Sequence, residues 1–297
     1  MDTVLVSVLL PVALGIVMFG LGLSLTVADF VRIRRKPRAV IVALVCQLAL
    51  LPLVCFGIVL LFDLTPLLAV GMLLLAASPG GTTANLFSHL FRGDVALNIT
   101  LTAVNSLIAI ATLPAIITLG LRHFEPTVGG EDVTLPLTKV LEVVAIVLVP
   151  VVLGMLVRRK FPELAARADR PVRILSAVVL AAVIAGAILS ERDNIGEYLA
   201  DVGLAALLFC AVSLAVGYFV PRAFGADRRQ ATACAMEIGI HNSTLAITVA
   251  ISVLDSVDLA IPAAVYSIVM FPAAALAGWL ISRRRAAVNP ADASTPA

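Results

Sequence analysis

Long apolar runs alternate with short polar connections along the whole chain. The runs fall at residues 3–29, 39–61, 66–91, 94–120, 135–157, 171–190, 199–221, 229–253 and 260–282. Each run reaches the length of about 20 residues with which an α-helix crosses the hydrocarbon core of a bilayer. Because the connections between the runs are short, the pattern predicts an all-α polytopic membrane protein with nine transmembrane helices in a single domain over residues 1–297.

The composition supports this fold class. Hydrophobic residues make up 61% of the 297 residues, charged residues make up 13%, and the mean hydropathy is +1.09. Soluble domains hold about 45–50% apolar and about 25% charged residues. Membrane lipid is therefore an expected partner, and the formal net charge of +2 gives no reason to expect nucleic acid. Residues 286–297 contain two prolines and mostly small side chains, and we expect a disordered tail there.

Basic residues gather in alternate connections between the predicted helices. One set of connections contains most of the Lys and Arg residues, in the segments 32–38, 158–173, 222–229 and 283–285. The opposite set collects many of the acidic residues. Since Lys and Arg favour the cytoplasmic side, we expect the N-terminus outside and the C-terminus in the cytoplasm, in a bacterial inner membrane.

Two of the predicted helices are interrupted near their middle. One interruption is the segment 78–85, which holds Pro79, Gly80 and Gly81, and the other is the segment 237–243, which holds Gly239. A pair of membrane segments broken by Gly or Pro is the best sequence indication of a transporter binding site, and it suggests inverted repeats. The two breaks together favour a transporter over a simple helical bundle.

Glu237 lies inside the second interrupted helix. An ionisable side chain at bilayer depth costs at least about 2.5–3.5 kcal/mol, so it usually faces a cavity, an ion or another polar group. A broken helix also exposes carbonyl oxygens, which can coordinate a monovalent cation. No cluster of His and Cys suggests a transition metal, and we expect Na⁺ to be the only metal ion.

Other polar residues in the apolar runs have a second interpretation. Asn98, Thr102 and Asn105 stand at i, i+4 and i+7 and so share one face of a helix, and Gln47 is a single amide in another run. Such residues commonly join membrane helices through hydrogen bonds worth about 0.6 kcal/mol each. From the residues alone, this structural role is favoured for the stripe and for Gln47.

The half-helices that restart after the breaks suggest an anion site. Free N–H groups at a helix start attract anions, and Thr82 or Thr83 is the expected cap of the first restart. Asn242 can begin the second restart. Two positive helix ends beside a cation site favour a small anion that is carried together with Na⁺.

Several strings in the chain resemble the bile acid:sodium symporter family. They run in the family's order through nearly the whole chain: Gly20-Leu21-Gly22-Leu23-Ser24-Leu25, Asp29-Phe30, Ser78-Pro79-Gly80-Gly81-Thr82 to Asn85, Arg92-Gly93-Asp94-Val95-Ala96-Leu97 and Glu237-Ile238-Gly239-Ile240-His241-Asn242. The resemblance implies a core domain with two crossing, unwound helices and a panel domain that moves against it. Bacterial relatives have ten helices in two inverted repeats, and this chain resembles the version without the first. The panel is then expected at about 3–29, part of 39–61, 135–157 and 171–190, and the core at about 39–120 and 199–282.

The resemblance also implies site residues. One sodium site would use the Ala84 backbone, Asn85, Asn98, Thr102 and Glu237, and a second would use Gln47, Glu237, the carbonyls of Ile238 and Ile240, and His241. These roles replace the structural interpretation of Asn98, Thr102 and Gln47. Small-anion contacts are implied at the two restarts, here Thr82 and Asn242.

Two positions depart from the family pattern. The second sodium site usually has Gln where this chain has His241, and an imidazole offers nitrogen, a poorer ligand for Na⁺ than oxygen. One sodium site is therefore expected, and the second lacks part of its usual ligand set. Asn98 stands where a hydroxyl residue is common, although its amide oxygen can still coordinate.

The resulting hypothesis is a sodium-coupled symporter that imports a small organic anion by alternating access. The candidate anions are a keto or hydroxy acid, a pantoate-like acid and a bile-acid-like amphipath, carried by a monomer or weak homo-oligomer. The main alternative is a proton-coupled carrier that uses Glu237 and His241. A channel or sensor and an intramembrane hydrolase are further alternatives. No enzymatic activity is expected, since Glu237 and His241 at i and i+4 have no second metal-binding histidine beside them.

Overall fold

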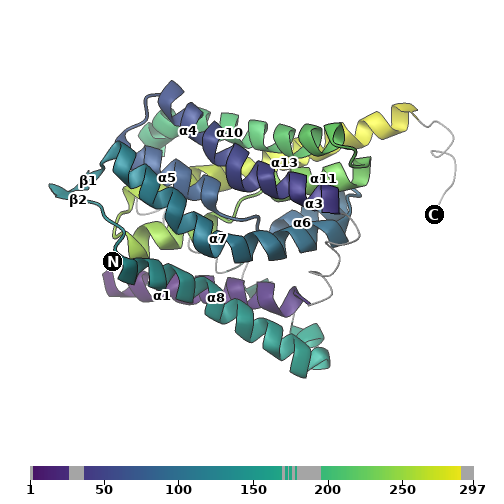
Figure 1. Cartoon of the computed structure of the whole chain (residues 1–297), viewed down its shortest axis with the longest axis horizontal. Coiled ribbons are helices and arrows are strands. Elements are labelled where there is room, and N and C mark those ends of the chain that lie inside the picture. Colours follow the sequence, from purple (N-terminus) through teal and green to yellow (C-terminus); the bar gives the residue numbers. More distant parts are fainter. Residues whose placement is uncertain are drawn as a thin grey trace.

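A computed structural model gives the fold of the chain (Figure 1). It describes residues 3–26, 37–168, 171–172, 174–175, 178 and 195–288. Helices dominate this part of the chain. The elements in order are α1 (Thr3–Ser24), α3 (Pro37–Val45), the π-helical turn η2 (Cys46–Leu50), α4 (Leu51–Leu61), α5 (Pro66–Ala77), α6 (Thr82–Leu90), α7 (Val95–Phe124), β1 (Thr127–Val128), β2 (Glu131–Asp132), α8 (Leu137–Lys160), α10 (Ile195–Ala223), α11 (Arg228–Gly239), α12 (Ser243–Thr248), the π-helical turn η3 (Val249–Val253), the 3₁₀ turn η4 (Asp258–Ala260) and α13 (Ile261–Val288).

The helices are those of a multi-pass membrane protein. Within the described residues, five helical segments are long and apolar enough to cross a bilayer unaided: Pro37–Leu61, Val95–Phe124, Leu137–Lys160, Ala200–Ala223 and Asp258–Arg283. The run expected at 171–190 lies largely outside the described residues, so the count of nine helices stays a prediction. The expected tail begins too early, because α13 continues to Val288; residues 289–297 lie outside the described part.

Both predicted helix interruptions are confirmed. α5 ends at Ala77 and α6 begins at Thr82, while α11 ends at Gly239 and α12 begins at Ser243. Proline explains the first break, because it has no N–H group and drives the preceding residue out of the helical region. Ser78, which precedes Pro79, accordingly has an extended backbone with φ −70° and ψ 136°.

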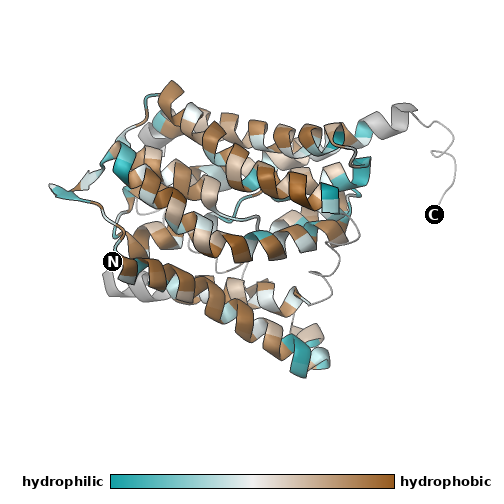
Figure 2. Cartoon of the chain, in the orientation of Figure 1, coloured by the Kyte–Doolittle hydropathy of each residue, from teal (hydrophilic) through white to brown (hydrophobic). Residues whose placement is uncertain are grey.

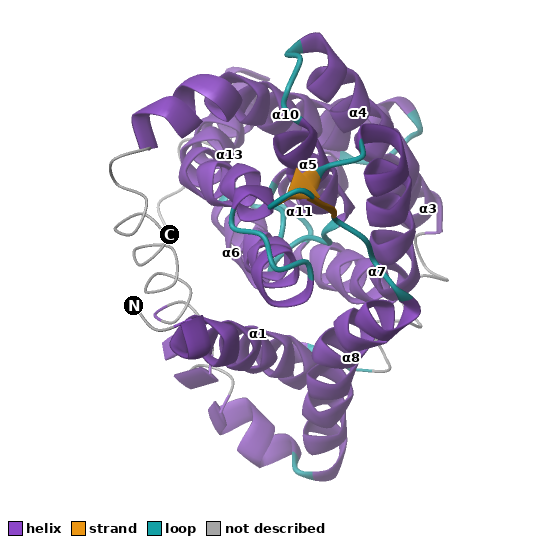
Figure 3. Cartoon of the chain, turned by 90° about the vertical axis from the view of Figure 1, so that its left-hand side faces the viewer, coloured by secondary structure: helices purple, strands orange, loops and turns teal. Residues whose placement is uncertain are grey.

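The helices form two groups. α1 packs mainly against α8, and this pair lies beside the larger group that holds α3 to α7 and α10 to α13 (Figures 1 and 3). The segment Pro37–Leu61 contacts α5, α7, α10 and α11 and therefore lies in the larger group. α1 and α8 come from two runs expected in the panel, whereas the run at 171–190 lies largely outside the described residues. The division into panel and core therefore stays a prediction.

Hydrogen bonds gather the ends of several helices on one side of the molecule. The Arg228 guanidinium donates to the Ile281 carbonyl, which joins the start of α11 to the end of α13. The Asp94 N–H donates to the Arg229 carbonyl at 2.9 Å, which brings the start of α7 to the same side. α1 begins on the opposite side, where the β1–β2 hairpin lies (Figure 1). The start of α1 and the end of α13 thus lie on opposite sides of the described part of the chain (Figure 1).

A polar hairpin connects α7 to α8, where the sequence pattern suggested only a loop. β1 and β2 pair antiparallel, and Gly129 and Gly130 form the turn with φ 63° and 89°. The hairpin and several helix ends are hydrophilic, whereas the helix faces between them are hydrophobic (Figure 2). This pattern fits a bilayer that covers the middle of the helices.

Close contact of α1 with α8 depends on two glycines. A Cβ at Gly22 would overlap the Val151 carbonyl oxygen, and a Cβ at Gly154 would overlap the Phe19 carbonyl oxygen. The backbones of the two helices can therefore approach only with hydrogen at both positions, as is common in membrane helix pairs.

We expect Gly22→Ala to lower the thermal stability of the purified protein, because overpacking typically costs about 1–3 kcal/mol. Gly15→Ala in the same helix is the matched control, since its Cβ would meet no atom within 4 Å. The measurement is the apparent melting temperature of both variants in detergent. Equal melting temperatures would contradict the close contact.

Candidate functional site

The two helix breaks cross and bond to each other. The Gly81 N–H donates to the Ile240 carbonyl at 3.2 Å, and the Asn242 N–H donates to the Pro79 carbonyl at 2.8 Å. These two bonds flank an antiparallel bridge between Gly80 and His241. Each break thus supplies hydrogen-bond partners for backbone groups of the other. Backbone groups buried in a membrane need such partners.

Helices α7 and α11 are joined by three rungs of hydrogen bonds at four-residue intervals. The first rung is the Asp94–Arg229 backbone bond at the helix starts. In the second, the Asn98 amide donates to the Ala233 carbonyl at 2.7 Å, and in the third the Thr102 hydroxyl donates to Glu237 Oε2 at 2.6 Å. Because both helices advance by about one turn between rungs, one face of α7 lies along α11 up to the break.

Glu237 is buried with an incomplete set of partners. Only 2% of the residue is exposed, and Thr102 is the hydrogen-bond donor to Oε2. Oε1 has no partner. The carboxylate lies against Gly80, where any Cβ would overlap it.

Two amide oxygens on helices that contact α11 also have no hydrogen-bond partner among the described residues. They include Oδ1 of Asn98, whose amide nitrogen is held by Ala233, and Oδ1 of Asn85 in α6. α6 contacts both α7 and α11, and Ala84 in its first turn is fully buried. Carboxylate and amide oxygens without donors are the groups that a hard cation needs. Among the residues predicted for the first sodium site, Glu237, Asn85 and Asn98 therefore each have an oxygen that could coordinate a cation.

A different arrangement surrounds Gln47 and His241, which were predicted for a second sodium site. Gln47 lies in the π-helical turn η2, and its amide donates to the Ser78 carbonyl at 3.2 Å. His241 Nδ1 lies 3.1 Å from the same carbonyl. The Gln47 amide nitrogen also lies 3.5 Å from Nδ1. We assign the proton of the ring to Nδ1, because the Ser78 carbonyl is the nearer of the two partners and can only accept. Gln47 Oε1 and His241 Nε2 have no partner.

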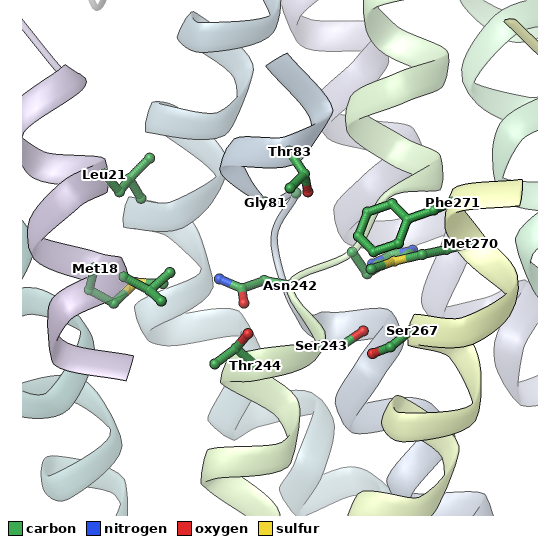
Figure 4. Close-up of a pocket in the computed structure, with 13 residues that line it drawn as sticks. Met18, Leu21, Gly81, Thr83, Asn242, Ser243, Thr244, Ser267, Met270 and Phe271 are labelled. Atoms are coloured by element: carbon green, nitrogen blue, oxygen red, sulfur yellow. The ribbon is translucent and has the colours of Figure 1, made fainter. Parts of the chain in front are cut away.

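A small cavity lies between α1 and the crossing (Figure 4). Its volume is about 40 Å³. The lining side chains in Figure 4 are Met18, Leu21, Thr83, Asn242, Ser243, Thr244, Ser267, Met270 and Phe271.

Asn242 has two roles at this cavity. It is the N-cap of α12, and its Oδ1 accepts the Leu245 N–H at 3.1 Å. Its amide nitrogen points toward α1 (Figure 4). Ser243 and Ser267 also line the cavity; the Ser267 hydroxyl donates to the Ala263 carbonyl at 2.8 Å, and Ser243 Oγ has no hydrogen-bond partner among the described residues. The cavity therefore offers hydrogen-bond donors opposite the α1 side chains Met18 and Leu21.

The predicted threonine cap of α6 is wrong. The N-cap residue is Gly81, which has no side chain to accept from the backbone, so the N–H groups of the first turn receive no side-chain cap. Thr82 opens the helix, and Thr83 lines the cavity. The close approach to Glu237 concerns the neighbouring Gly80, where a Cβ would overlap the carboxylate.

Some residues of the cavity had no signal in the sequence. Met18 and Leu21 are ordinary apolar residues of the first run, and Met270 and Phe271 are ordinary apolar residues of the last. Ser267 was detectable only as a hydroxyl in an apolar run. Their meeting depends on how α1 and α13 pack against the crossing, and periodicity does not predict that packing.

Similar proteins are sodium transporters by their descriptions. The chain is 27% identical over 263 residues to the uncharacterized sodium-dependent transporter YocS of Bacillus subtilis, covering 89% of this chain and 79% of YocS. It is 27% identical to the human ileal sodium/bile acid cotransporter, covering 83% of this chain and 70% of the relative. It is also 29% identical to the probable chloroplastic sodium/metabolite cotransporter BASS1 of Arabidopsis thaliana, covering 86% and 62%.

The family model gives the same result. Residues 11–198 match the model described as the sodium bile acid symporter family, which is more than half of the chain. The match includes the first helix break and the α7 residues that face Glu237. The chain belongs to the sodium bile acid symporter family.

Proposed function

We propose that this protein is a sodium-coupled symporter that imports a small organic anion by alternating access across a bacterial inner membrane. The observation that carries the proposal is the buried Glu237 carboxylate at the crossing, with one oxygen that has no hydrogen-bond partner. A buried charge without a counter-charge is strongly unfavourable. Family membership supports Na⁺ as the coupling ion.

The proposed cation ligands come from three helices. They are Glu237 and the amide oxygens of Asn85 and Asn98, with the Ala84 backbone and Thr102 as further contributors. Thr102 orients the carboxylate through Oε2 and leaves Oε1 for the ion. Because the amides are neutral, a monovalent cation balances the single carboxylate.

The proposed anion site is the cavity beside α1. The Asn242 amide and the start of α6 supply donors for a carboxylate, with Thr82 as the residue that opens the helix. The Ser243 and Ser267 hydroxyls suit a hydroxyl or keto oxygen on the same molecule. A volume of about 40 Å³ holds only a few heavy atoms, so this state favours a small keto or hydroxy acid over a bile acid.

Coupling follows from the shared backbone of the two sites. Gly80 contacts the Glu237 carboxylate, and Gly81 and His241 each line the cavity. A cation at Glu237 would fix the position of the two helix breaks where they cross. The backbone of these breaks carries the donors for the anion. Binding of either ligand should therefore favour binding of the other.

Uptake into proteoliposomes tests the proposal. The purified full chain is reconstituted, and uptake of pantoate, a 2-keto acid, a 2-hydroxy acid and taurocholate is measured with an inward gradient of Na⁺ or of choline. We expect at least one small acid to accumulate only with Na⁺. Uptake that ignores the sodium gradient would contradict symport, and uptake driven by a pH gradient without Na⁺ would favour the proton-coupled alternative through Glu237 and His241.

Thr102→Val tests the proposed cation ligands. A hydrogen bond to a charged group is worth about 1.5–3 kcal/mol, so we expect the sodium affinity to fall by at least about tenfold. Thr100→Val is the matched control, because Thr100 is also buried in α7 but donates only to the Ala96 carbonyl. The measurement is the sodium dependence of anion uptake. Equal sodium dependence in both variants would show that Thr102 does not contribute to the cation site.

Asn242→Asp tests the proposed anion site. Aspartate can keep the cap on Leu245, but it replaces the amide donor with negative charge. We expect anion binding to be lost while sodium binding remains, as measured by calorimetry with the acid that wild type transports. Anion binding at wild-type affinity would show that the carboxylate of the transported acid binds at another place.

A further inference from the structure

We propose that hydrogen bonds from Gln47 and His241 replace a second cation at the crossing, so that each chain binds one Na⁺, at the Glu237 set. The inference rests on the proposed function and adds the stoichiometry of the ion. It concerns the part of the crossing around the Ser78 carbonyl, where Gln47 and His241 do not fit a sodium ion.

The Ser78 carbonyl is the first reason. The helix break releases this oxygen from the backbone ladder of α5, and a released carbonyl is a typical ligand for Na⁺. In this protein it receives two donors, the Gln47 amide at 3.2 Å and His241 Nδ1 at 3.1 Å. A carbonyl oxygen has two lone pairs, so both are in use.

Carbonyl oxygens of the second break also accept hydrogen bonds from the protein. The Tyr266 hydroxyl donates to the Gly239 carbonyl at 2.9 Å, and the Gly81 N–H donates to the Ile240 carbonyl at 3.2 Å. The Ile238 carbonyl differs, because the Asn242 N–H that would reach it in a continuous helix donates to Pro79 instead. Of the carbonyls predicted for the second site, Ile240 is therefore bonded and Ile238 is released.

The imidazole itself is held by aromatic rings. His241 stacks on Phe209 with ring centroids 5.4 Å apart and meets Tyr266 edge-on at 5.5 Å. His241 and Tyr266 are both buried. A ring fixed on two sides and bonded through Nδ1 presents nitrogen where a cation needs oxygen.

The oxygens that remain are too few. Gln47 Oε1 has no partner and the Ile238 carbonyl is released, while Glu237 Oε1 already belongs to the first set. Two neutral oxygens without a carboxylate of their own do not balance the charge of an ion at bilayer depth. The crossing is instead joined here by Gln47 and His241, whether or not an ion is bound.

Equilibrium binding of ²²Na⁺ to the purified full chain, with K⁺ as the replacing ion, tests this stoichiometry without a known substrate. We expect wild type to bind one ion per chain with a hyperbolic dependence on concentration. Gln47→Met keeps the side-chain length without oxygen or nitrogen, and we expect it to bind one ion as well. Glu237→Gln should bind none.

Other outcomes overturn the inference. Two ions per wild-type chain, or loss of binding in Gln47→Met that keeps its wild-type melting profile, would make Gln47 a cation ligand. Binding that survives in Glu237→Gln would assign the ion to another place. If wild type binds no ²²Na⁺, the proposed function fails as well, whereas two ions leave symport intact and overturn only the single-ion stoichiometry. Because wild type alone distinguishes one ion from two, the test holds even if a variant does not fold.

Discussion

The buried carboxylate of Glu237 is the constraint on which the rest of the structure depends. It lies at membrane depth with one hydrogen-bonded oxygen and one oxygen without a partner. Around it, α7 runs along α11 in a register that brings Thr102 to the carboxylate, and Gly80 leaves room for it. A larger residue at Gly80 or a shifted α7 would leave this charge without its neighbours. The arrangement of three helices therefore follows from one charge that must be compensated.

The crossing of the two breaks makes this site useful for transport. Backbone that is not helical is tolerated in a membrane only where the protein satisfies it, and here the two breaks bond to each other. The two helix breaks lie against Glu237 on one side and line the small cavity beside α1 on the other. The cavity also borders α1, which packs mainly against α8 in the pair that lies beside the larger group of helices (Figure 3). A movement of that pair would change access to the cavity without separating the two breaks.

The sequence predicted the helices and their breaks well, because hydropathy, proline and glycine act locally. It also predicted that Glu237 needs a partner, since a charge in an apolar run is visible without a structure. The role of Asn98 and Thr102 was not decided by the residues themselves, because an amide that joins helices and one that binds an ion look alike in a sequence. Packing shows that Asn98 joins α7 to α11 through its nitrogen, while its oxygen has no hydrogen-bond partner among the described residues; its role as an ion ligand stays a prediction. The threonine cap predicted for α6 was wrong, and the cavity residues of α13 depend on tertiary packing that could not be predicted.

The central claim is that cation and anion bind to one crossing and stabilise each other. The most direct test is the shift in melting temperature that a transported carboxylate causes in purified protein, measured in Na⁺ and in K⁺ at equal ionic strength. A ligand that binds the folded state raises its stability in proportion to its affinity. We predict a clear shift in Na⁺ and little or none in K⁺. An equal shift in both salts would contradict the coupling.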